Sequence, residues 1–576
     1  MSDLNAAPSR IKDLWHACRE VLTSFGTSLH KWFVLATIVG VITGFGVAGA
    51  SLIAEHYFES RVLAAGSIWI FLFIPVLGLG VAALVIRYLT PDRNPDTTEA
   101  FLENYHSPGE YLGWRSLPAK IAAAVFTVGS GGSMGFEGPS IYLGAVTGSE
   151  AQQLSHKQFR GDESKVMTVA GAAAGLSAIF RAPLTGVMFS IEGPYMFDLV
   201  RFAVAPALVA SAASYLVYTA IRGTTPFFQV EGFASVRAVE LLGAVVIGVA
   251  SALAMRLFLW IIKITGGVFK PLPVWLRVVI GGFLLSALAV ISFELTGSPI
   301  TLGEGVRGAQ RFLVGDISSP FMGIVPLLVL LVVMKMIATA ATMKAGGVGG
   351  VFFPLSFIGA GLGAAFHAIL PAGDPSLYPV VGIAAMISAA FRAPLTGAAF
   401  VAETTGATSF LIPGLLAAAA ATSLMGKKSV SGVQVEHERS VVTASRRIPL
   451  SQMIDKSATP RVVAPEMSLT EYAAGGWTEP ALVEDGDDVV GLMDEDCLFK
   501  CRLQDRDTTT VRDVMDAKPV RLDATTALRD AASQLLRKQK RYAVVFADGE
   551  PLGFVSDTQI LQRQEGRLIA DGSDMD

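Results

Sequence analysis

The chain has 576 residues, of which 52% are hydrophobic and 16% charged, with a formal net charge of -4. Its mean hydropathy of +0.52 is too high for a soluble globular protein of this size, and the absence of a basic cluster argues against a nucleic-acid partner. We therefore expect an integral membrane protein that crosses the plasma or inner membrane several times.

The first elements, in chain order, are a charged segment and a long apolar stretch. Residues 1–30 contain no apolar run with a small-residue cleavage site, so we expect a cytoplasmic segment and not a signal peptide. The 22 residues from Phe33 to Ala54 carry no charge, which is enough for a helix to cross a hydrocarbon core of about 30 Å. Later apolar segments such as 118–130 and 139–153 are too short for this, and they predict interrupted or re-entrant helices.

The apolar region is a tandem of two related halves. The heptapeptide FRAPLTG at Phe180–Gly186 recurs at Phe391–Gly397, a shift of 211 residues. Four further positions repeat at a shift of 215: Gly135, Pro139, Gly144 and Gly148 match Gly350, Pro354, Gly359 and Gly363. Repeated, interrupted hydrophobic segments predict a transport site between the halves. We place the membrane domain at 31–435, with halves of about 31–225 and 235–435, and we expect the glycines at 144, 148, 359 and 363 to permit close helix packing.

A single acidic residue, Glu137, lies in the segment Gly131–Pro139, just before an uncharged helix. A charge at membrane depth costs about 2.5–3.5 kcal/mol on insertion scales, so this carboxylate needs a partner. The N–H groups at a helix N-terminus attract anions. We therefore predict that Glu137 exchanges with a diffusible anion.

The matching segment of the second half, Gly346–Pro354, contains no acid. Pro354 favours a helix start, and the amides of Val351, Phe352 and Phe353 are positioned to bind an anion without a fixed cation. Two helix N-termini, one from each half, would then converge on one site. This geometry favours an anionic substrate.

These residues resemble the CLC family of chloride channels and proton-coupled chloride transporters. Gly135–Pro139 is similar to the family motif G-[KR]-E-G-P, with Phe136 at the usual basic position and Gly138 after the glutamate. Gly350–Pro354 is similar to G-x-F-x-P, and Lys120 lies 17 residues before Glu137, as a family lysine near the pore does.

The resemblance implies an all-α polytopic membrane protein with an inverted internal repeat and broken helices. It further implies a homodimer with one pore per subunit, Glu137 as the gating glutamate, and a central anion site formed by amides of Val351 and Phe352. Phe136, Gly138, Phe353 and Lys120 would complete the anion-binding residues.

Two departures from the family concern the inner anion site. The family's G-S-G-I-P segment should fall near Pro91–Asp96, where no such motif occurs, and Ser431 stands at the position of the pore-lining tyrosine. The inner site is therefore more open or differently lined, which leaves fluoride or another anion as an alternative to chloride.

A third departure concerns the proton path. Glu192 matches the first of two adjacent glutamates in the coupled transporters, and Gly193 stands where the second, the internal proton acceptor, is expected. Glu403 is the repeat counterpart of Glu192, which favours a shared structural role such as satisfying a helix end. Arg181 and Arg392, which precede prolines in the repeat, are predicted to lie at helix starts near an aqueous face.

The C-terminal part differs sharply in charge. Residues 441–576 carry 17 Lys+Arg and 24 Asp+Glu of the chain's 94 charged residues, so a domain boundary is expected near residue 440. The chain from Val511, with expected strands 542–546 and 552–555, resembles a CBS motif, and 449–500 resembles a more divergent first copy. Together they predict a cytoplasmic α/β regulatory domain at 445–570.

The ligand of this tail stays open. CBS pairs often bind adenine nucleotides through an acid three residues after a Ser or Thr, but Gln559 and Cys497 stand at those positions. The alternatives are an adenine nucleotide and a structural, dimer-stabilising role. With Cys18 and Cys501, Cys497 makes three cysteines, too few and too separate to predict a disulfide framework or a metal site.

The sequence therefore predicts an anion-transporting membrane protein that is not an enzyme and needs no cofactor. Replacement of the internal proton glutamate by Gly193 favours a channel or a weakly coupled pathway. The alternative is proton/anion exchange in which water or Glu192 replaces the missing acceptor.

Overall fold

The computed structural model describes residues 32–54, 68–107, 111–154, 165–230, 237–436 and, with short gaps, 449–560. The predictions for residues 1–30, Cys18 and Cys501 lie outside these residues. The chain divides into two compact units, Met1–His437 and Glu438–Asp576, close to the rise in charge density near residue 440.

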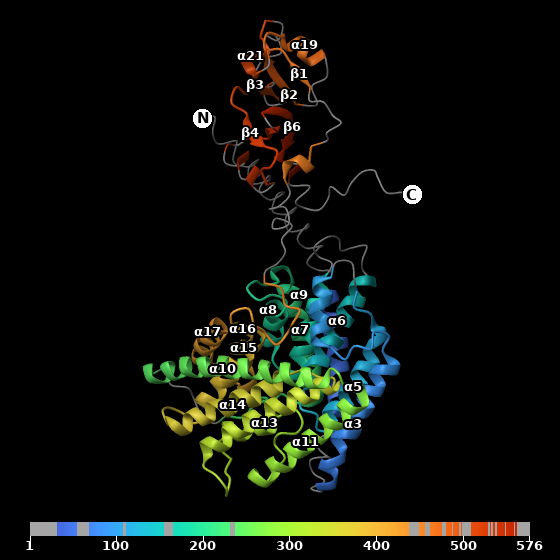
Figure 1. Ribbon diagram of the computed structural model, residues 1–576, viewed down its shortest axis with the longest axis vertical. Helices are drawn as coiled ribbons and strands as arrows, with labels where there is room; N and C mark the ends of the chain where they lie inside the picture. The colour runs from blue at the N-terminus through green and yellow to red at the C-terminus, as the bar shows by residue number, and fades with distance from the viewer. Residues whose placement is uncertain are drawn as a thin grey trace, which may run out of the picture. The chain divides into compact units, whose positions relative to one another are not determined.

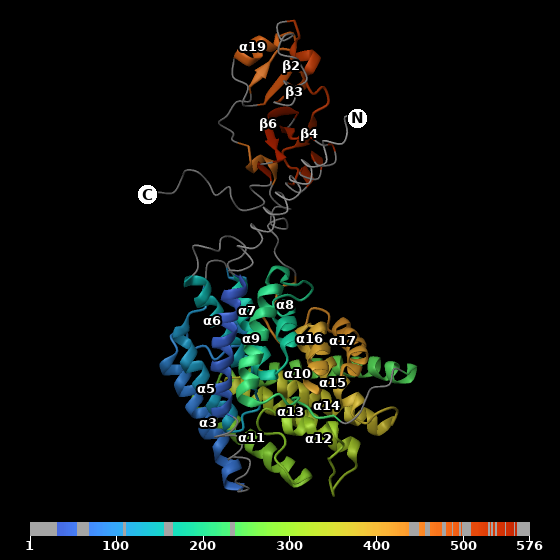
Figure 2. The same cartoon turned by 180° about the vertical axis from the view of Figure 1, so that it is seen from behind.

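The first unit is entirely helical in its described part. Eight helices there are long and apolar enough to cross a membrane. In chain order the helices are Trp32–Ala54, α3 (Ile68–Leu89), α4 (Thr98–His106), α5 (Leu117–Gly129), α6 (Glu137–Leu154), α7 (Val166–Phe180), α8 (Pro183–Glu192), α9 (Val204–Arg222), α10 (Ala238–Phe269), α11 (Val274–Thr296), α12 (Val306–Leu313), α13 (Ile324–Ala345), α14 (Phe352–Ile369), α15 (Leu377–Phe391), α16 (Pro394–Thr405) and α17 (Leu411–Met425). Helices α10, α13 and α14 of the second half run side by side (Figures 1 and 2).

Of the two segments predicted to be short, 118–130 corresponds to α5, with 13 residues, whereas 139–153 lies within α6, which has 18. Further short helices arise at the FRAPLTG repeat. In each copy a 15-residue helix, α7 or α15, ends at an arginine in the left-handed conformation, Arg181 (φ 53°) or Arg392 (φ 55°). Two residues later a proline starts the next helix, where its missing N–H is not needed. The prediction that these arginines lie at helix starts is therefore wrong: each is the C-cap of the preceding helix. Arg392 is also buried, and its guanidinium donates to the Gly426 carbonyl.

The repeated glycines lie where helix backbones touch. A Cβ on Gly144 would overlap the carbonyl of Gly171 in α7, and a Cβ on Gly363 would overlap the carbonyl of Tyr378 in α15. Gly148 and Gly359 face the backbones of α7 and α15 in the same way. The predicted packing role of these glycines is confirmed, and it joins α6 to α7 and α14 to α15.

Hydrogen bonds between the halves follow the 215-residue shift. Thr127 of α5 accepts a bond from the Val348 amide (3.1 Å), and Thr342 of α13 accepts one from the Ser133 amide (3.0 Å). Each threonine is the repeat counterpart of the other, and so are the two amides. The pair of reciprocal bonds fixes the loops that precede α6 and α14.

The second unit contains two small sheets of the same topology. The first has strand order β1 (Val462–Val463), β2 (Ala481–Asp485), β3 (Asp488–Met493), and the second has β4 (Val520–Asp523), β5 (Tyr542–Ala547), β6 (Glu550–Ser556). In each sheet the first pair of strands is parallel and the second pair antiparallel. The two expected strands of the second copy are confirmed, and the shared topology supports the interpretation of 449–500 as a related copy.

The two copies exchange their entry segments. Leu450, which precedes the first sheet, is buried with β4 and β5 of the second, whereas Val511 and Val514 of α21 (Val511–Val514) are buried with β2 and β3 of the first. Backbone bonds join Leu450 to Thr526 (3.0 Å) and Val511 to Met467 (2.9 Å). Each segment therefore precedes one copy in the sequence and packs in the hydrophobic core of the other.

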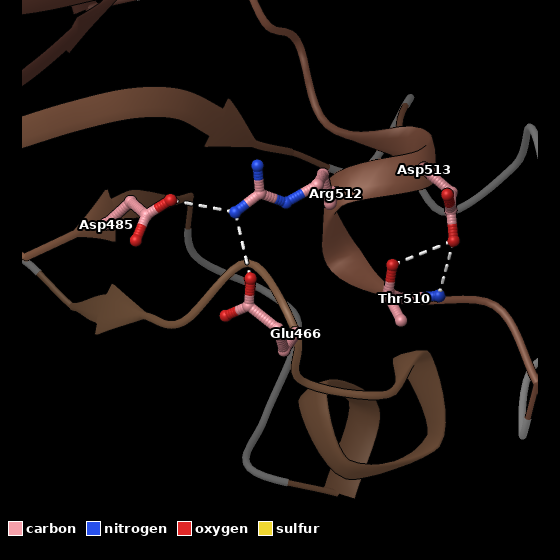
Figure 3. Close-up of polar contacts among 5 residues, drawn as sticks. All are labelled: Glu466, Asp485, Thr510, Arg512 and Asp513. Carbon is pink, nitrogen blue, oxygen red and sulfur yellow. Dashed lines mark hydrogen bonds and ion pairs between the residues drawn. The ribbon is translucent and has the colours of Figure 1, made fainter.

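Side-chain contacts anchor α21 to the first copy (Figure 3). Arg512 donates to Glu466 and to Asp485, both at 2.8 Å. The carboxylate of Asp513 accepts hydrogen bonds from the amide and the hydroxyl of Thr510, the residue that caps the start of the helix. These two hydrogen bonds hold the pKa of Asp513 below its usual value. A carboxyl group whose pKa is lower in the folded than in the unfolded state stabilises the fold fully at a pH above its unfolded-state pKa. The contribution of this cap to stability is therefore lost as the pH falls through the acidic range to the folded-state pKa of Asp513.

Candidate anion-binding site

Glu137 lies at the start of α6 and reaches the N-terminus of α14 in the other half. Its Oε1 accepts hydrogen bonds from the amides of Phe352 (2.6 Å) and Phe353 (3.4 Å), and the side chain is fully buried. The carboxylate therefore occupies the orphan donors that a helix N-terminus offers to an anion. An anion that took this place would find the same amides.

Two glycines, one from each half, make room for this carboxylate. Gly135 and Gly350 pair through reciprocal backbone bonds of 2.9 and 2.8 Å. A Cβ on Gly350 would lie 2.6 Å from Oε1 of Glu137, and a Cβ on Gly135 would overlap Oε2. Oε2 has no hydrogen-bond partner in the described part of the chain. The two loops thus leave just enough space for the carboxylate of Glu137.

Phenylalanines of both halves surround the first turn of α14. Phe352 stacks on Phe391 at 4.6 Å between ring centroids, and it also contacts Phe180 at 5.2 Å. Phe180 and Phe391 are the first residues of the two FRAPLTG copies. Phe353 stacks on Phe227 at 5.0 Å. These rings bury the first turn of α14 in an apolar environment, in which an amide interacts more strongly with an anion than it does in water.

A cavity of about 170 Å³ reaches the same helix end from the other side. Val351, Phe352 and Ser431 line it, so the structure brings together three of the predicted anion-binding residues. Glu99 and Lys344 also line this cavity, which we call the inner cavity. Both charged residues were missed by the sequence analysis.

Thr97, at the start of α4, is a further residue that the motif comparison missed. It lines the inner cavity, and its hydroxyl is buried without a partner in the described residues. A Cβ on Gly138 would lie 2.6 Å from that hydroxyl. Thr97 thus adds a polar residue to the lining of the inner cavity although the G-S-G-I-P motif is absent, and its position just after Pro91–Asp96 was the available signal.

The N-terminus of α6 is partly occupied by a fixed acid. The amide of Phe136 donates to Oε1 of Glu304 (3.1 Å), a buried residue of the second half. An anion on this side therefore meets a helix start whose Phe136 amide is already engaged. The sequence analysis named Phe136 and Gly138 for this position, but it missed Glu304.

Lys120 is not among the residues that line the inner cavity. Its ammonium donates to the Asp96 carbonyl (2.7 Å) and lies 3.5 Å from Asp92. Its counterpart at a shift of 215, Lys335, donates to the Gly303 carbonyl (2.6 Å) in the same manner. Both lysines bind the loop before a short helix, α4 or α12, so the contacts of Lys120 are those of a residue that supports this loop.

Glu192 and Glu403 form a reciprocal pair between the halves. Glu192 accepts from the amides of Leu395 (3.0 Å) and Thr396 (2.7 Å) at the start of α16. Glu403 accepts from the amides of Leu184 (2.8 Å) and Thr185 (2.7 Å) at the start of α8. The helix-end role predicted from the repeat is confirmed for both side chains, and α8 packs against α16 (Figures 1 and 2).

Gly193 is the C-cap of α8, directly after Glu192. Its carbonyl accepts a bond of 2.7 Å from the side-chain amide of Gln434. Neither Glu192 nor Gly193 lines the inner cavity.

Removing either carboxylate of this pair is expected to destabilise the protein by a similar amount. Glu192→Ala and Glu403→Ala each leave two backbone amides and one threonine hydroxyl without their acceptor, which costs about 1–3 kcal/mol. Thermal unfolding in detergent measures both, with Glu150→Ala as the control. A large effect of Glu192→Ala with none of Glu403→Ala would contradict the paired structural role.

The proposed nucleotide position of the second unit is engaged internally. The Ser556 amide donates to Oε1 of Gln559, and the Gln559 amide donates to Oγ of Ser556, both at 3.0 Å. Cys497, at the equivalent position of the first copy, is buried. The Ser556–Gln559 pair caps a chain turn, and no carboxylate stands at either position for a ribose.

Comparison with known proteins agrees with this arrangement. Residues 77–426 match the family model described as voltage gated chloride channel, and 511–566 match the CBS domain model. A putative chloride channel protein ClcB-like of Ralstonia nicotianae is 30% identical over 360 residues, 61% of this chain and 81% of its own length. The voltage-gated ClC-type chloride channel ClcB of Citrobacter koseri is 28% identical over 424 residues, 69% of this chain and 96% of its own length.

Solved structures show the same fold. A CLC-type fluoride/proton antiporter has 19% identity and a TM-score of 0.61, over 71% of this chain and 98% of its own. A slow cyanobacterial Cl-/H+ antiporter has 23% identity and a TM-score of 0.60, over 69% of this chain and 96% of its own. With the family model covering more than half of its length, the chain belongs to the CLC family of voltage-gated chloride channels and carries a C-terminal CBS region.

Proposed function

We propose that this protein conducts chloride or a related anion across a membrane by a passive or weakly coupled pathway. The observation that carries the proposal is the position of the Glu137 carboxylate on the amides of Phe352 and Phe353. The carboxylate binds these amides as a diffusible anion would if it took the same place. Glu137 then acts as the gate, and the names of the Ralstonia and Citrobacter relatives support an anion of the chloride type.

The inner cavity supplies the second part of the pathway. Thr97 and Ser431 present hydroxyl groups beside Val351 and Phe352, and hydroxyl and amide donors suit a small anion. Without a tyrosine at position 431 this site is less constricted. A series of reversal potentials across fluoride, chloride, bromide and nitrate would rank the permeant anions.

We propose weak coupling between anion and proton movement because Gly193 stands where the internal proton acceptor is expected. Gly193 carries no titratable group, and Glu192 is committed to the start of α16. Neither lines the inner cavity. Glu192 is therefore a poor substitute for the missing glutamate, and protons have no evident carrier along that route.

Proton exchange through another residue is the second candidate, and Glu99 is the observation that favours it. Its side chain lines the inner cavity together with Phe352, whose amide holds Glu137. Asp96, Lys344 and Glu103 are the charged groups that act on it. Water in the cavity would link the two glutamates, since a polar cavity of this size holds ordered water.

Purified protein in liposomes with a chloride gradient distinguishes the two modes when anion efflux and external pH are recorded together. Efflux without uphill proton movement supports the passive pathway. Stoichiometric proton pumping would overturn it. No anion efflux from a monodisperse sample would contradict the proposed function as a whole.

We expect Glu99→Gln to show the same proton movement as the wild-type protein, because the proposed passive pathway uses no internal proton acceptor. Glu150→Gln is the control, since Glu150 accepts a bond from the Trp114 amide (3.1 Å) and does not line the inner cavity. If the wild-type protein pumps protons and only Glu99→Gln reduces pumping by about tenfold while anion flux continues, Glu99 is the substitute acceptor. Equal pumping in all three proteins would exclude it.

The remaining features of the proposal concern the assembly. We infer a multi-pass protein in the plasma or inner membrane, with both termini in the cytoplasm, that forms a homodimer with one pathway per subunit. The second unit would regulate or stabilise that dimer, and the Ser556–Gln559 contact supports a structural role over adenine nucleotide binding. Cross-linking of the reconstituted protein and calorimetric titration with ATP and AMP test the two inferences separately.

A further inference from the structure

A second cavity in the membrane unit has a strongly basic lining. It has a volume of about 470 Å³ and lies where α3 ends, α11 begins and α13 ends. Arg87, Arg93, Arg277 and Lys344 line it, and none of its lining residues is acidic. We call this cavity the basic pocket.

The three arginines of the basic pocket have no ion-pair partner among the described residues, whereas Glu99 acts on the fourth cation, Lys344, from the inner cavity. Arg277 donates to the backbone carbonyls of Leu272 (2.7 Å) and Lys270 (2.9 Å), which fixes its position and leaves its charge uncompensated. Among the described residues no carboxylate lies within ion-pair distance of any of the four cations. Four like charges around one cavity repel one another, and a bound anion with several acceptor oxygens would relieve that repulsion.

The surroundings of the basic pocket are those of a membrane interface. Tyr88 and Leu89 at the end of α3 are 71% and 63% exposed, and Trp275 at the start of α11 is 66% exposed. Tyrosine and tryptophan concentrate where the hydrocarbon meets the headgroups. Below them α3 and α11 expose apolar side chains, among them Leu84 at 56% and Ile280 at 38%, that acyl chains can cover.

We propose that the basic pocket binds the phosphate of an anionic phospholipid, with the acyl chains lying along α3 and α11. Basic pockets between transmembrane helices are suited to such headgroups. Lys344 also lines the inner cavity, so a bound lipid phosphate would compete for a cation that attracts permeant anions. This binding does not depend on whether transport is passive or coupled.

The test is native mass spectrometry of the full-length protein with phosphatidylglycerol, phosphatidylcholine or inorganic phosphate added in detergent. The variant is Arg87→Gln/Arg93→Gln, which removes two of the four charges and leaves Lys344 in place. Arg201→Gln is the control, because Arg201 is an exposed arginine that pairs with Asp198 (3.6 Å) outside the pocket. Gel filtration establishes that each variant is folded.

We expect the wild-type protein and Arg201→Gln to retain phosphatidylglycerol in preference to phosphatidylcholine, and the double variant to lose at least about tenfold of that affinity, or about 1.4 kcal/mol. If inorganic phosphate bound as tightly as phosphatidylglycerol and displaced it at millimolar concentration, the site would be assigned to free phosphate, and the lipid proposal would be wrong. Equal retention by all three proteins would also overturn the proposal.

Discussion

Replacement of Glu137 by glutamine is expected to give an anion pathway that stays open and no longer responds to pH. Glutamine has nearly the same shape but no charge, so the amides of Phe352 and Phe353 lose a charged acceptor. Hydrogen bonds to charged groups contribute about 1.5–3 kcal/mol, so the closed position should lose at least about tenfold in occupancy. Anion flux continues because the amides themselves remain.

Planar bilayer recording or liposome efflux between pH 4.5 and 7.5 measures this change. Glu150→Gln serves as the control, since Glu150 belongs to the same helix α6 and contacts only the amide of Trp114 (3.1 Å) among the described partners. A folded Glu137→Gln protein that conducts no anions would show that Glu137 is not a gate. An unchanged pH response would show that another group carries the proton.

The second large effect is expected at the helix crossing of α6 and α7. Gly148→Ala would place a methyl group within the carbonyl of Met167, which is backbone and has no rotamer to change. Overpacking of a close contact costs about 1–3 kcal/mol, and here the two helices must separate along their length. We expect a large loss of folded protein, with the same result for Gly363→Ala in the second half.

Gly267→Ala provides the matched control for these substitutions. Gly267 lies inside α10, and a Cβ there would meet nothing within 4 Å, so alanine should gain about 0.5–1 kcal/mol from lower backbone entropy. Thermal unfolding of the three purified variants measures the expected loss of stability and the expected gain in one experiment. Equal stability of Gly148→Ala and Gly267→Ala would mean that the α6–α7 contact is looser than described.

Much of the candidate site was visible in the sequence because a repeat constrains both halves at once. The approach of Glu137 to Phe352 follows from two proline-marked helix starts at equivalent positions. The reciprocal role of Glu192 and Glu403 follows from their equivalence alone. In these cases local chemistry and symmetry point to the same arrangement.

Other contacts depend on which side chain faces the other half, and the sequence does not state this. Glu304 belongs to no motif, so nothing local marks its contact with the Phe136 amide. Thr97 is marked only by its position just after Pro91–Asp96. Lys335 was detectable by adding 215 to Lys120, and that comparison would have revealed the structural role of Lys120. In the FRAPLTG repeat the proline correctly predicts a helix start, but the arginine before it belongs to the previous helix, which its left-handed conformation ends.

Because the two copies of the second unit exchange their entry segments, the stability of each copy depends on the other. Leu450 fills one hydrophobic core and Val511 fills the other, although each comes from the opposite copy. Opening either segment removes a buried side chain from its neighbour, so the two copies should lose their structure in one cooperative transition. A truncation between residues 500 and 511 would therefore not release an intact first copy. It would leave that copy without α21 and deprive the membrane unit of any regulation that depends on a folded tail.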